Sequence, residues 1–295
     1  MNIVDIFSLE KSAPKIASDT EHYEPKAPQI SNLASVDPNA QIGDDCEIGP
    51  FCVIGPDVKI GRGTILQNNV SVHGHVSIGE DNRISTGAVI GGEPQDISYK
   101  GSPTKVIVGD RNIIRENVTI NRASEKEEGL TQVGSDCYLM ACSHVAHDCI
   151  VGDSVVLGQG SMLGGHVHVH HHATISGCVA VVHYVSVGSY IFLGGSSRAL
   201  QDIPPFMLCD GNPARPRCIN IVGLKRNNFS KEVIQAIDEA FRLLYRSRVG
   251  LDNAIEILQN KGMMLPELEY CLDFVRTSQS GRHGRGREKN TRKAA

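Results

Sequence analysis

The chain repeats a pattern every six residues. Written in blocks of six that each end on an aliphatic residue, residues 31–90 give ten consecutive blocks, from SNLASV and DPNAQI to STGAVI. The pattern returns in GDRNII and RENVTI, and it then runs for ten more blocks from Gly134 to Leu193. Position six is Ile, Val or Leu throughout, and position four is usually Ala, Cys, Ser, Thr or Val. A repeat this regular predicts a solenoid.

A six-residue period suits a short strand followed by a tight corner. Alternate residues of a strand point to opposite faces, so positions four and six point into the molecule. Gly is common at position one, where a corner needs a permissive backbone. Three flat sides close a coil of 18 residues, and coils stacked at roughly 4.8 Å form a triangular prism. The sequence therefore predicts an all-β solenoid, a parallel β-helix of hexapeptide repeats.

The same register places several cysteines. Cys46, Cys52, Cys137 and Cys149 all occupy the inward position four, so we interpret them as small buried hydrophobic residues. The chain has nine cysteines and no CxxC pair. This argues against both a secreted disulfide scaffold and a cysteine zinc site.

The predicted prism spans residues 29–226 and is interrupted twice. The segments GGEPQDISYKGSPT at 91–104 and NRASEKEEGL at 121–130 break the period. Insertions in a solenoid leave it as loops and often build its binding surface. We therefore expect both loops to lie near a functional site.

The two ends of the chain do not follow the repeat. Residues 227–275 have apolar residues at helical spacing, with Ser230 as an N-cap and a second helix that ends at Gly262, and predict a small C-terminal α-helical domain. Residues 1–28 are expected to form a partly disordered extension. Residues 276–295 are basic and rich in Arg, Gly and Ser, which predicts a disordered tail.

Charge and hydropathy exclude some partners. The formal net charge of -4 provides no general attraction to nucleic acid. No segment reaches the roughly 18 apolar residues of a membrane-spanning helix. The first residues also lack the apolar core of a signal peptide. We therefore expect a cytoplasmic protein with no nucleic-acid partner and no stable membrane insertion.

Four histidines share one side of the predicted prism. His144 occupies position five of its block and His147 position two, so neither side chain points into the core. In steps of 18 residues, His147 stacks with Gly165 and then with His183, and His166 lies beside the glycine. Two coils separate His147 from His183, at about 4.8 Å per coil, which is too far for both to ligate one metal ion. A metal there would require a second subunit.

Chemistry without a metal is simpler for this cluster. His147 can take a proton from a substrate hydroxyl, and Asp148 can fix the tautomer of its ring. The backbone N–H of Gly165 can then donate to the oxyanion that forms. These three residues are typical of direct acyl transfer to an alcohol.

The run HVHVHHH at residues 166–172 suggests metal binding at first sight. Ala173 is at the inward position of its block, so His170, His171 and His172 fall on a corner and its flank. We expect these three side chains to be solvated, and we predict no native metal site.

Ordered segments along the chain are similar to those of one enzyme family. They are GPFCVIGPDVKIG, PQDISYKGSPT, RENVTINR, GLTQVGSDCYLM, SHVAHDCIVGD, GGHV, QDIPPFMLCDGNPA and NIVGLKR, and they extend over about residues 30–275. Together they resemble the acyl-carrier-protein–UDP-N-acetylglucosamine O-acyltransferases, which catalyse the first step of lipid A synthesis. The resemblance implies a left-handed β-helix and a homotrimer with active sites in clefts between neighbouring prisms.

The resemblance also implies the reaction. A long 3-hydroxy fatty acyl group would pass from acyl carrier protein to the 3-hydroxyl of UDP-N-acetylglucosamine, with no cofactor because the thioester is already activated. By motif position, His147 would be the general base, Asp148 its orienting neighbour and Gly165 the oxyanion donor. The residues implied in binding the sugar nucleotide or the acyl group are Asp96, His144, His166, Asn220, Arg226 and Gly195. A glycine at the last of these leaves room for a long acyl chain.

Three positions depart from the family pattern. Ser98 stands where QDLKY would have a lysine expected to contact substrate, and Lys100 is a candidate to reach the same anion. Val182 and His183 replace the His and Gln of VHQF, which makes His183 a further substrate-binding candidate. These changes leave open whether the acceptor carries a hydroxyl or an amine at its 3-position.

Two other functions fit the same fold. One is a zinc hydro-lyase of the carbonic anhydrase type, which would hold a stoichiometric metal with histidines at a subunit interface. The other is a non-catalytic scaffold. His147 with Asp148 and Gly165 argues against the scaffold, and the lack of three histidines around one point argues against the metal enzyme.

Overall fold

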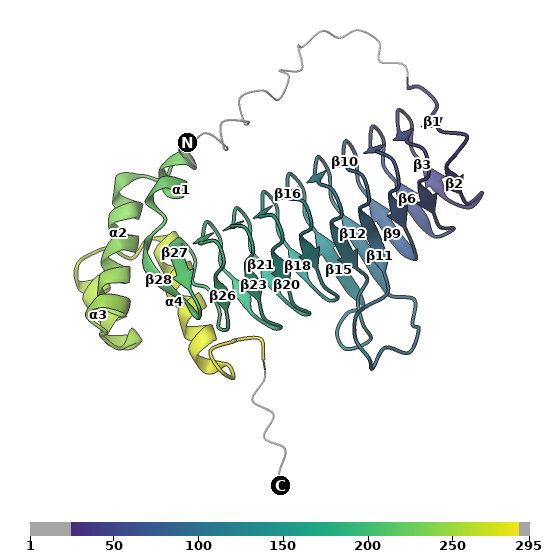
Figure 1. The fold of residues 1–295 in the computed structure, drawn as a ribbon. Helices are drawn as coiled ribbons and strands as arrows, with labels where there is room; N and C mark the ends of the chain where they lie inside the picture. Colours follow the sequence, from purple (N-terminus) through teal and green to yellow (C-terminus); the bar gives the residue numbers. More distant parts are fainter. Residues whose placement is uncertain (1–24, 289–295) are drawn as a thin grey trace, which may run out of the picture.

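The computed structural model describes residues 25–288, which form a long triangular prism with a helical domain at one end (Figure 1). Each coil contributes one short strand to each of three sheets that run along the prism. Paired strands come from successive coils, as where His144 pairs with Met162 and Val145 with Leu163. This spacing of 18 residues confirms the predicted parallel β-helix of hexapeptide repeats.

The first sheet has 11 strands and ends in an antiparallel hairpin formed by its last two. Its strands are β1 (Gln29–Ile30), β4 (Glu47–Ile48), β7 (Ile65–Leu66), β10 (Arg83–Ile84), β13 (Ile113–Ile114), β16 (Tyr138–Leu139), β19 (Val156–Leu157), β22 (Thr174–Ile175), β25 (Phe192–Leu193), β27 (Met207–Gly211) and β28 (Ala214–Ile219). The second sheet has 9 strands. They are β2 (Ser35–Val36), β5 (Val53–Ile54), β8 (Ser71–Val72), β11 (Val89–Gly92), β14 (Thr119–Asn121), β17 (His144–Val145), β20 (Met162–Leu163), β23 (Ala180–Val181) and β26 (Arg198–Ala199). The third sheet has 8 strands. They are β3 (Gln41–Ile42), β6 (Val58–Ile60), β9 (His75–Ile78), β12 (Lys105–Val108), β15 (Leu130–Val133), β18 (Ile150–Val151), β21 (His168–Val169) and β24 (Ser186–Val187).

Aliphatic side chains from position six fill the inside of the prism, with the small residues of position four beside them. The four cysteines predicted to be buried are each 1% exposed or less, namely Cys46, Cys52, Cys137 and Cys149. Burial raises the pKa of the Cys137 and Cys149 thiols to about 12. These thiols therefore stay protonated and belong to the core.

The corners of the prism differ from the expectation in one respect. The left-handed backbone falls on position three of the block rather than position one, and non-glycine residues adopt it. The φ angle is 60° at Asp148 and 64° at both His166 and Tyr184. Glycine at position one permits close approach instead, since a Cβ on Gly61 would lie 2.6 Å from the carbonyl carbon of Gly79 in the next coil. Position three is therefore free to carry functional side chains.

Two loops leave the prism at the edge between the second and third sheets. Residues 93–104 join β11 to β12, and residues 122–129 join β14 to β15. Figure 1 shows both loops projecting from the same side of the prism. The Glu125 carboxylate ties them together, because it accepts from the backbone N–H of Lys100 at 3.0 Å and of Ser102 at 3.3 Å. The two loops thus form one unit.

A helical domain closes the end of the prism that carries β27 and β28 (Figure 1). Its helices are α1 (Ile221–Arg226), α2 (Lys231–Phe241), the π-helix η2 (Arg242–Arg246), α3 (Leu251–Asn260) and α4 (Pro266–Ser280). Ser230 caps α2 as predicted, because its side chain accepts from the Val233 N–H at 3.2 Å. Helix α1 lies within the range predicted as prism. Between residues 25 and 288, no helix is long and apolar enough to cross a bilayer.

The prediction of a disordered tail from residue 276 is wrong for the part that the structure describes. Helix α4 continues to Ser280, and residues 281–288 then fold back toward the prism. Ser278 Oγ donates to the Gly284 carbonyl at 3.0 Å, and the Gly286 N–H donates to Asp202 at 2.7 Å. Composition predicts disorder here because it contains no information about specific contacts of this kind. The predicted extension at residues 1–28 lies almost wholly outside the described residues.

The alternation of buried and exposed positions predicts the effect of truncations in β6. Ile60 is 3% exposed, whereas its neighbour Lys59 points outward. We expect Ile60→Ala to lower the free energy of unfolding by about 2–5 kcal/mol, because it opens a cavity in the core. Lys59→Ala, the matched control, is expected to stay within about 0.5 kcal/mol of wild type. Urea unfolding followed by circular dichroism measures both, and equal effects would contradict this core register.

Candidate active site

The candidate site lies on the edge between the second and third sheets, at the corner between β17 and β18. His147 and Asp148 form this corner. In the next coil, the His166 N–H donates to the His147 carbonyl, and in the coil after that the Tyr184 N–H donates to the Gly165 carbonyl, both at 3.1 Å. The edge therefore stacks corner residues from successive coils, and it is the edge from which both loops project.

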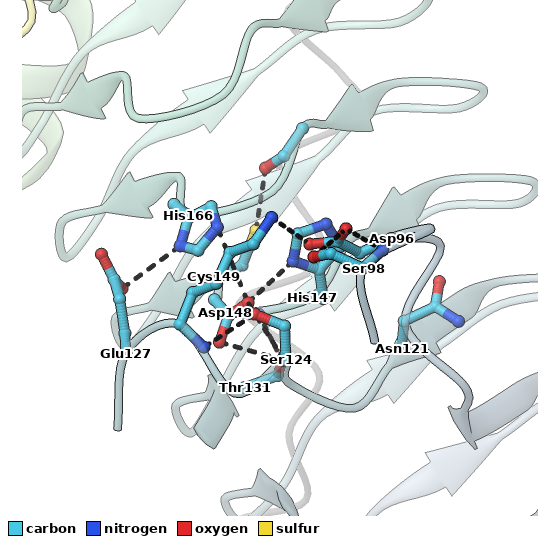
Figure 2. Close-up of polar contacts among 12 residues, drawn as sticks. Asp96, Ser98, Asn121, Ser124, Glu127, Thr131, His147, Asp148, Cys149 and His166 are labelled. Carbon is cyan, nitrogen blue, oxygen red and sulfur yellow. Dashed lines mark hydrogen bonds and ion pairs between the residues drawn. The ribbon is translucent and has the colours of Figure 1, made fainter. Parts of the chain in front are cut away.

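His147 and Asp148 form a short hydrogen-bonded pair. His147 Nδ1 lies 2.7 Å from Asp148 Oδ2, and the two side chains are 13% and 1% exposed. Figure 2 shows the pair between the two loops. A proton held on Nδ1 by the carboxylate leaves the lone pair on Nε2. The pair is therefore arranged so that His147 can accept a proton through Nε2.

Hydrogen bonds hold the Asp148 carboxylate inside the protein. Oδ2 accepts from Ser124 Oγ at 2.7 Å and from the Ser124 N–H at 3.1 Å, while the Asp148 N–H donates to Thr131 Oγ1 at 2.8 Å. Burial alone would raise the pKa of this carboxyl, but the hydrogen bonds from His147 and Ser124 outweigh burial and lower it. Asp148 is thus a buried anion beside the imidazole.

Gly165 lies directly against the His147 ring. A Cβ built at Gly165 would be 2.4 Å from Cε1 and 2.7 Å from Nε2 of that ring. Within residues 25–288 its backbone N–H has no hydrogen-bond partner. The corner therefore places this donor next to the His147 ring, and a side chain larger than that of glycine would require the ring to move.

His166 contacts the pair from the next coil. Its ring packs edge-on to that of His147, with centroids 5.2 Å apart, and stacks on Tyr184 at 4.4 Å. Nε2 lies 3.8 Å from Asp148 Oδ2, and Nδ1 lies 3.4 Å from Glu127 Oε2. Burial lowers the pKa of His166, against the opposing effect of the two carboxylates. His166 is therefore part of the wall around His147.

Two further predicted histidines lie around this centre. His144 Nδ1 is 2.7 Å from Thr119 Oγ1, and burial, followed by the proximity of His147, lowers the pKa of His144. His183 is exposed, and its ring packs edge-on to Tyr184 at 5.8 Å. The structure thus brings His144, His147 and His166 together and leaves His183 at the solvent side.

The loops add charged groups beside the histidines. Asp96 lies 2.6 Å from Lys126 Nζ, and it accepts from Ser98 Oγ at 2.8 Å. The Lys126 hydrogen bond, followed by those from Ser98, lowers the pKa of Asp96. Figure 2 places Asp96 and Ser98 close to His147. The cation that accompanies Asp96 is thus Lys126 from the second loop, whereas Lys100 is exposed.

The remaining predicted binding residues lie elsewhere in the chain. Gly195 occupies a corner on another edge, where a Cβ would meet the Gly177 carbonyl at 3.4 Å. Asn220 caps α1, since its side chain accepts from the Gly223 N–H at 3.1 Å and donates to the Tyr190 carbonyl at 2.8 Å. Arg226 is exposed at the end of the same helix. A single chain does not bring these residues to His147.

One group of side chains at the centre has the spacing of metal ligands. Atoms from His147, Asp148 and His166 lie within 4.8 Å of one another. The carboxylate, however, is already occupied by His147 and Ser124. A donor set of two histidines and one fully hydrogen-bonded carboxylate favours proton transfer over metal binding.

The expectation that His170, His171 and His172 are all solvated is wrong for two of them. His170 Nδ1 lies 3.1 Å from the Tyr270 hydroxyl of α4, and the His172 ring stacks on Tyr190 at 4.7 Å. Aromatic side chains of the helical domain and of the next coil cover them. His171 is exposed and lies 3.2 Å from Asp153.

Several residues of the site were not predicted from the sequence. Tyr184 was detectable, because it follows Asp148 and His166 at steps of 18 residues. Ser124, Lys126 and Glu127 belong to a loop that breaks the repeat, so no periodic signal locates them.

Two protein-family models match parts of this chain. A family model described as domain 2 of UDP N-acetylglucosamine O-acyltransferase matches residues 202–285. The bacterial transferase hexapeptide model matches residues 39–73, 57–92 and 130–165.

Solved structures match most of the chain. The UDP-N-acetylglucosamine acyltransferase LpxA from Bacteroides fragilis 9343 is 38% identical with a TM-score of 0.81, and the match covers 84% of this chain and 97% of that one. The chain belongs to the UDP-N-acetylglucosamine acyltransferase family. LpxA from Acinetobacter baumannii is 38% identical with a TM-score of 0.80, covering 83% of this chain and 95% of that one. The acyltransferase from Francisella novicida is 37% identical with a TM-score of 0.81, covering 84% and 91%.

Membership of the UDP-N-acetylglucosamine acyltransferase family confirms the resemblance drawn from the ordered segments. The left-handed form of the β-helix with a small helical domain is confirmed as well.

The buried Asp148 predicts a pH-dependent contribution to stability. Because its pKa is lowered on folding, the ionised carboxylate stabilises the fold above the unfolded value of about 3.9, and this stabilisation is lost as the pH falls through the folded pKa. We expect Asp148→Asn to cost about 1–3 kcal/mol at pH 7 and less at pH 3. Urea unfolding at both values measures this difference. Asp57→Asn, which removes a carboxylate that is 54% exposed, serves as the control. If the loss of unfolding free energy in Asp148→Asn does not shrink at low pH, Asp148 is not the stabilising anion described above.

Proposed function

We propose that this protein transfers a long 3-hydroxy fatty acyl group from acyl carrier protein to the 3-hydroxyl of UDP-N-acetylglucosamine, the first step of lipid A biosynthesis. The observation that carries the proposal is the His147–Asp148 pair at 2.7 Å, with Gly165 packed directly against the imidazole. Among residues 25–288 the Gly165 N–H has no hydrogen-bond partner. Family membership supports the substrate class. The reaction takes place in the cytoplasm.

The proposed chemistry is general-base catalysis. Nε2 of His147 takes the proton of the 3-hydroxyl as the sugar oxygen attacks the thioester carbonyl, forming the C–O bond. The Gly165 N–H donates to the oxyanion of the tetrahedral intermediate. When the C–S bond breaks, the imidazolium returns the proton to the leaving thiolate. No cofactor is needed, because the thioester carries the activation.

Asp148 stabilises the imidazolium that forms during this step. It is 1% exposed, so its charge acts on His147 through a medium with little water. Ser124 and Thr131 hold the carboxylate and its backbone in place. Asp148 thereby keeps the ring in the tautomer that leaves Nε2 basic.

The substrate groups are assigned to residues around this centre. We propose that Asp96, His144 and His166 hold the sugar nucleotide or the acyl group near His147. Asn220 and Arg226 would bind the acyl or nucleotide end, and Gly195 would admit a long acyl chain. Because the last three lie away from His147 within one chain, the site requires a neighbouring prism, and we propose a homotrimer with the sites between subunits.

The loops supply the groups that distinguish this chain. Lys126 is half exposed and pairs with Asp96, so it offers the anionic substrate a cation where Ser98 does not. Lys100 and the exposed His183 are further substrate-binding candidates at the solvent side of the site. These residues are expected to contact the acceptor sugar. The test therefore includes both the 3-hydroxy and the 3-amino sugar nucleotide.

The role of His147 is tested by removing its imidazole. Wild type is expected to acylate UDP-N-acetylglucosamine from a long-chain 3-hydroxyacyl carrier protein, and His147→Ala to lose about 10²–10⁴ in kcat, because the general base is removed. Radiolabelled product on thin-layer chromatography measures the rate. The 3-amino sugar nucleotide is assayed in parallel. Turnover with this analogue alone would contradict the 3-hydroxyl as acceptor and assign the 3-amino group instead. No transfer to either acceptor, together with a tightly bound stoichiometric metal, would favour the zinc hydro-lyase.

The role of Gly165 is tested by adding a methyl group. A methyl group there would push the His147 ring out of place and crowd the oxyanion, so we expect Gly165→Ala to lower kcat about 10²-fold or more. Gly177→Ala is a matched control at the same block position on another edge, where a Cβ meets only the Gln159 carbonyl at 3.4 Å. The control is expected to keep wild-type activity. Equal activity of the two variants would refute the role of Gly165.

A further inference from the structure

The chain after α4 returns to the edge that carries the candidate active site. We call residues 281–288 the C-terminal strap; Figure 1 shows it turning back from the end of α4 toward the prism. Asp202, which lies on this edge one coil after Tyr184, anchors it. The Asp202 N–H donates to the Gly284 carbonyl at 2.9 Å, and its Oδ2 accepts from the Gly286 N–H at 2.7 Å.

The anchor is built into the prism. Asp202 Oδ1 accepts from the Ser186 N–H of β24 at 2.7 Å, so one carboxylate joins the strap to a strand of the third sheet. Arg285 adds a hydrogen bond to the Leu200 carbonyl at 3.3 Å. Two glycines permit the close packing, since a Cβ on Gly281 would lie 2.0 Å from the Arg285 carbonyl oxygen and one on Gly286 would lie 2.7 Å from Thr277 Cγ2. The strap thus follows a defined path.

This path places the Arg287 guanidinium at the active-site corner. Arg287 Nη1 donates to the His166 carbonyl oxygen, and Nη2 lies 3.2 Å from both carboxylate oxygens of Glu127. Glu127 Oε2 in turn lies 3.4 Å from His166 Nδ1, a buried atom with no shorter partner in residues 25–288. The Arg287 and Glu127 side chains are 24% and 34% exposed. Charge-assisted contacts of this kind, partly shielded from water, restrict movement of the groups they join.

The contacts converge on the turn that contains Gly165. The His166 N–H is held by the His147 carbonyl, and the Gly165 carbonyl is held by the Tyr184 N–H. Arg287 holds the third point, the His166 carbonyl, so both peptide groups flanking the turn residue are fixed. Its donors are directed at protein groups, which argues for positioning rather than for substrate contact.

We propose that Arg287 is a positioning residue for acyl transfer, which fixes the Gly165–His166 turn and Glu127 against the His147–Asp148 pair. The inference rests on the proposed function for its kinetic consequence. Through this contact the end of the helical domain completes a site that lies several coils away. A displacement of the turn would misdirect the Gly165 N–H, which acts in the transition state, so the effect belongs mainly to kcat.

The test uses the full-length protein with acyl carrier protein and UDP-N-acetylglucosamine. Arg287→Ala is expected to lower kcat about tenfold or more, with KM for the sugar nucleotide within about threefold of wild type. Arg287→Lys is expected to recover only part of the loss, because an ammonium cannot bridge a carbonyl and a carboxylate as a planar fork does. Glu127→Gln is expected to lower kcat similarly, and the double variant to be little worse than either single one.

A readout independent of activity separates this proposal from the proposed function. In Arg287→Ala, hydrogen–deuterium exchange is expected to rise at residues 122–129 and around Gly165. This result is expected even if the wild-type protein acylates neither acceptor. Arg282→Ala is the matched control; its side chain is 54% exposed and pairs with Glu288, and the expected result is wild-type kcat and exchange. Wild-type kcat in Arg287→Ala, or a lower melting temperature with unchanged kcat below melting, would overturn the proposal. Equal losses in the Arg282 and Arg287 variants would overturn it too.

Discussion

Backbone hydrogen bonds between successive coils are the constraint on which the whole molecule depends. Most strands here have only two residues, too few to be stable alone, so each exists because the coils before and after it are in register. The Gly134 N–H, for example, donates to the Val151 carbonyl of the next coil at 2.8 Å. Because every coil repeats this ladder, a side chain at one block position lies against the residue 18 further on.

The active-site corner is a direct use of this stacking. Position two carries His147, Gly165 and His183 in successive coils, and position three carries Asp148, His166 and Tyr184. Asp148 adopts the left-handed backbone of position three and lies under the loop that carries Ser124. Burial there raises the pKa of its carboxyl, and the hydrogen bonds from His147 and Ser124 outweigh burial and lower it. Gly165, at position two of the next coil, has no side chain. This leaves the space that the His147 imidazole occupies.

Segments that leave the repeat complete the centre. The two loops and the C-terminal strap meet the same edge, and each contributes through a charged contact: Lys126 with Asp96, Ser124 with Asp148, and Arg287 with Glu127. The prism supplies rigid spacing, whereas these segments supply charge and shield it from water.

The sequence by itself determined the prism, its inward residues, the two loops and the pairing of His147 with Asp148 and Gly165, because a period of six converts position directly into spatial neighbours. Tyr184 follows from the same arithmetic. Only the tertiary structure decided that position three bears the left-handed backbone, that Lys126 pairs with Asp96, and that residues 276–288 are ordered beside the site. Those contacts join segments of irregular backbone far apart in the chain, and no local pattern encodes which of them meet.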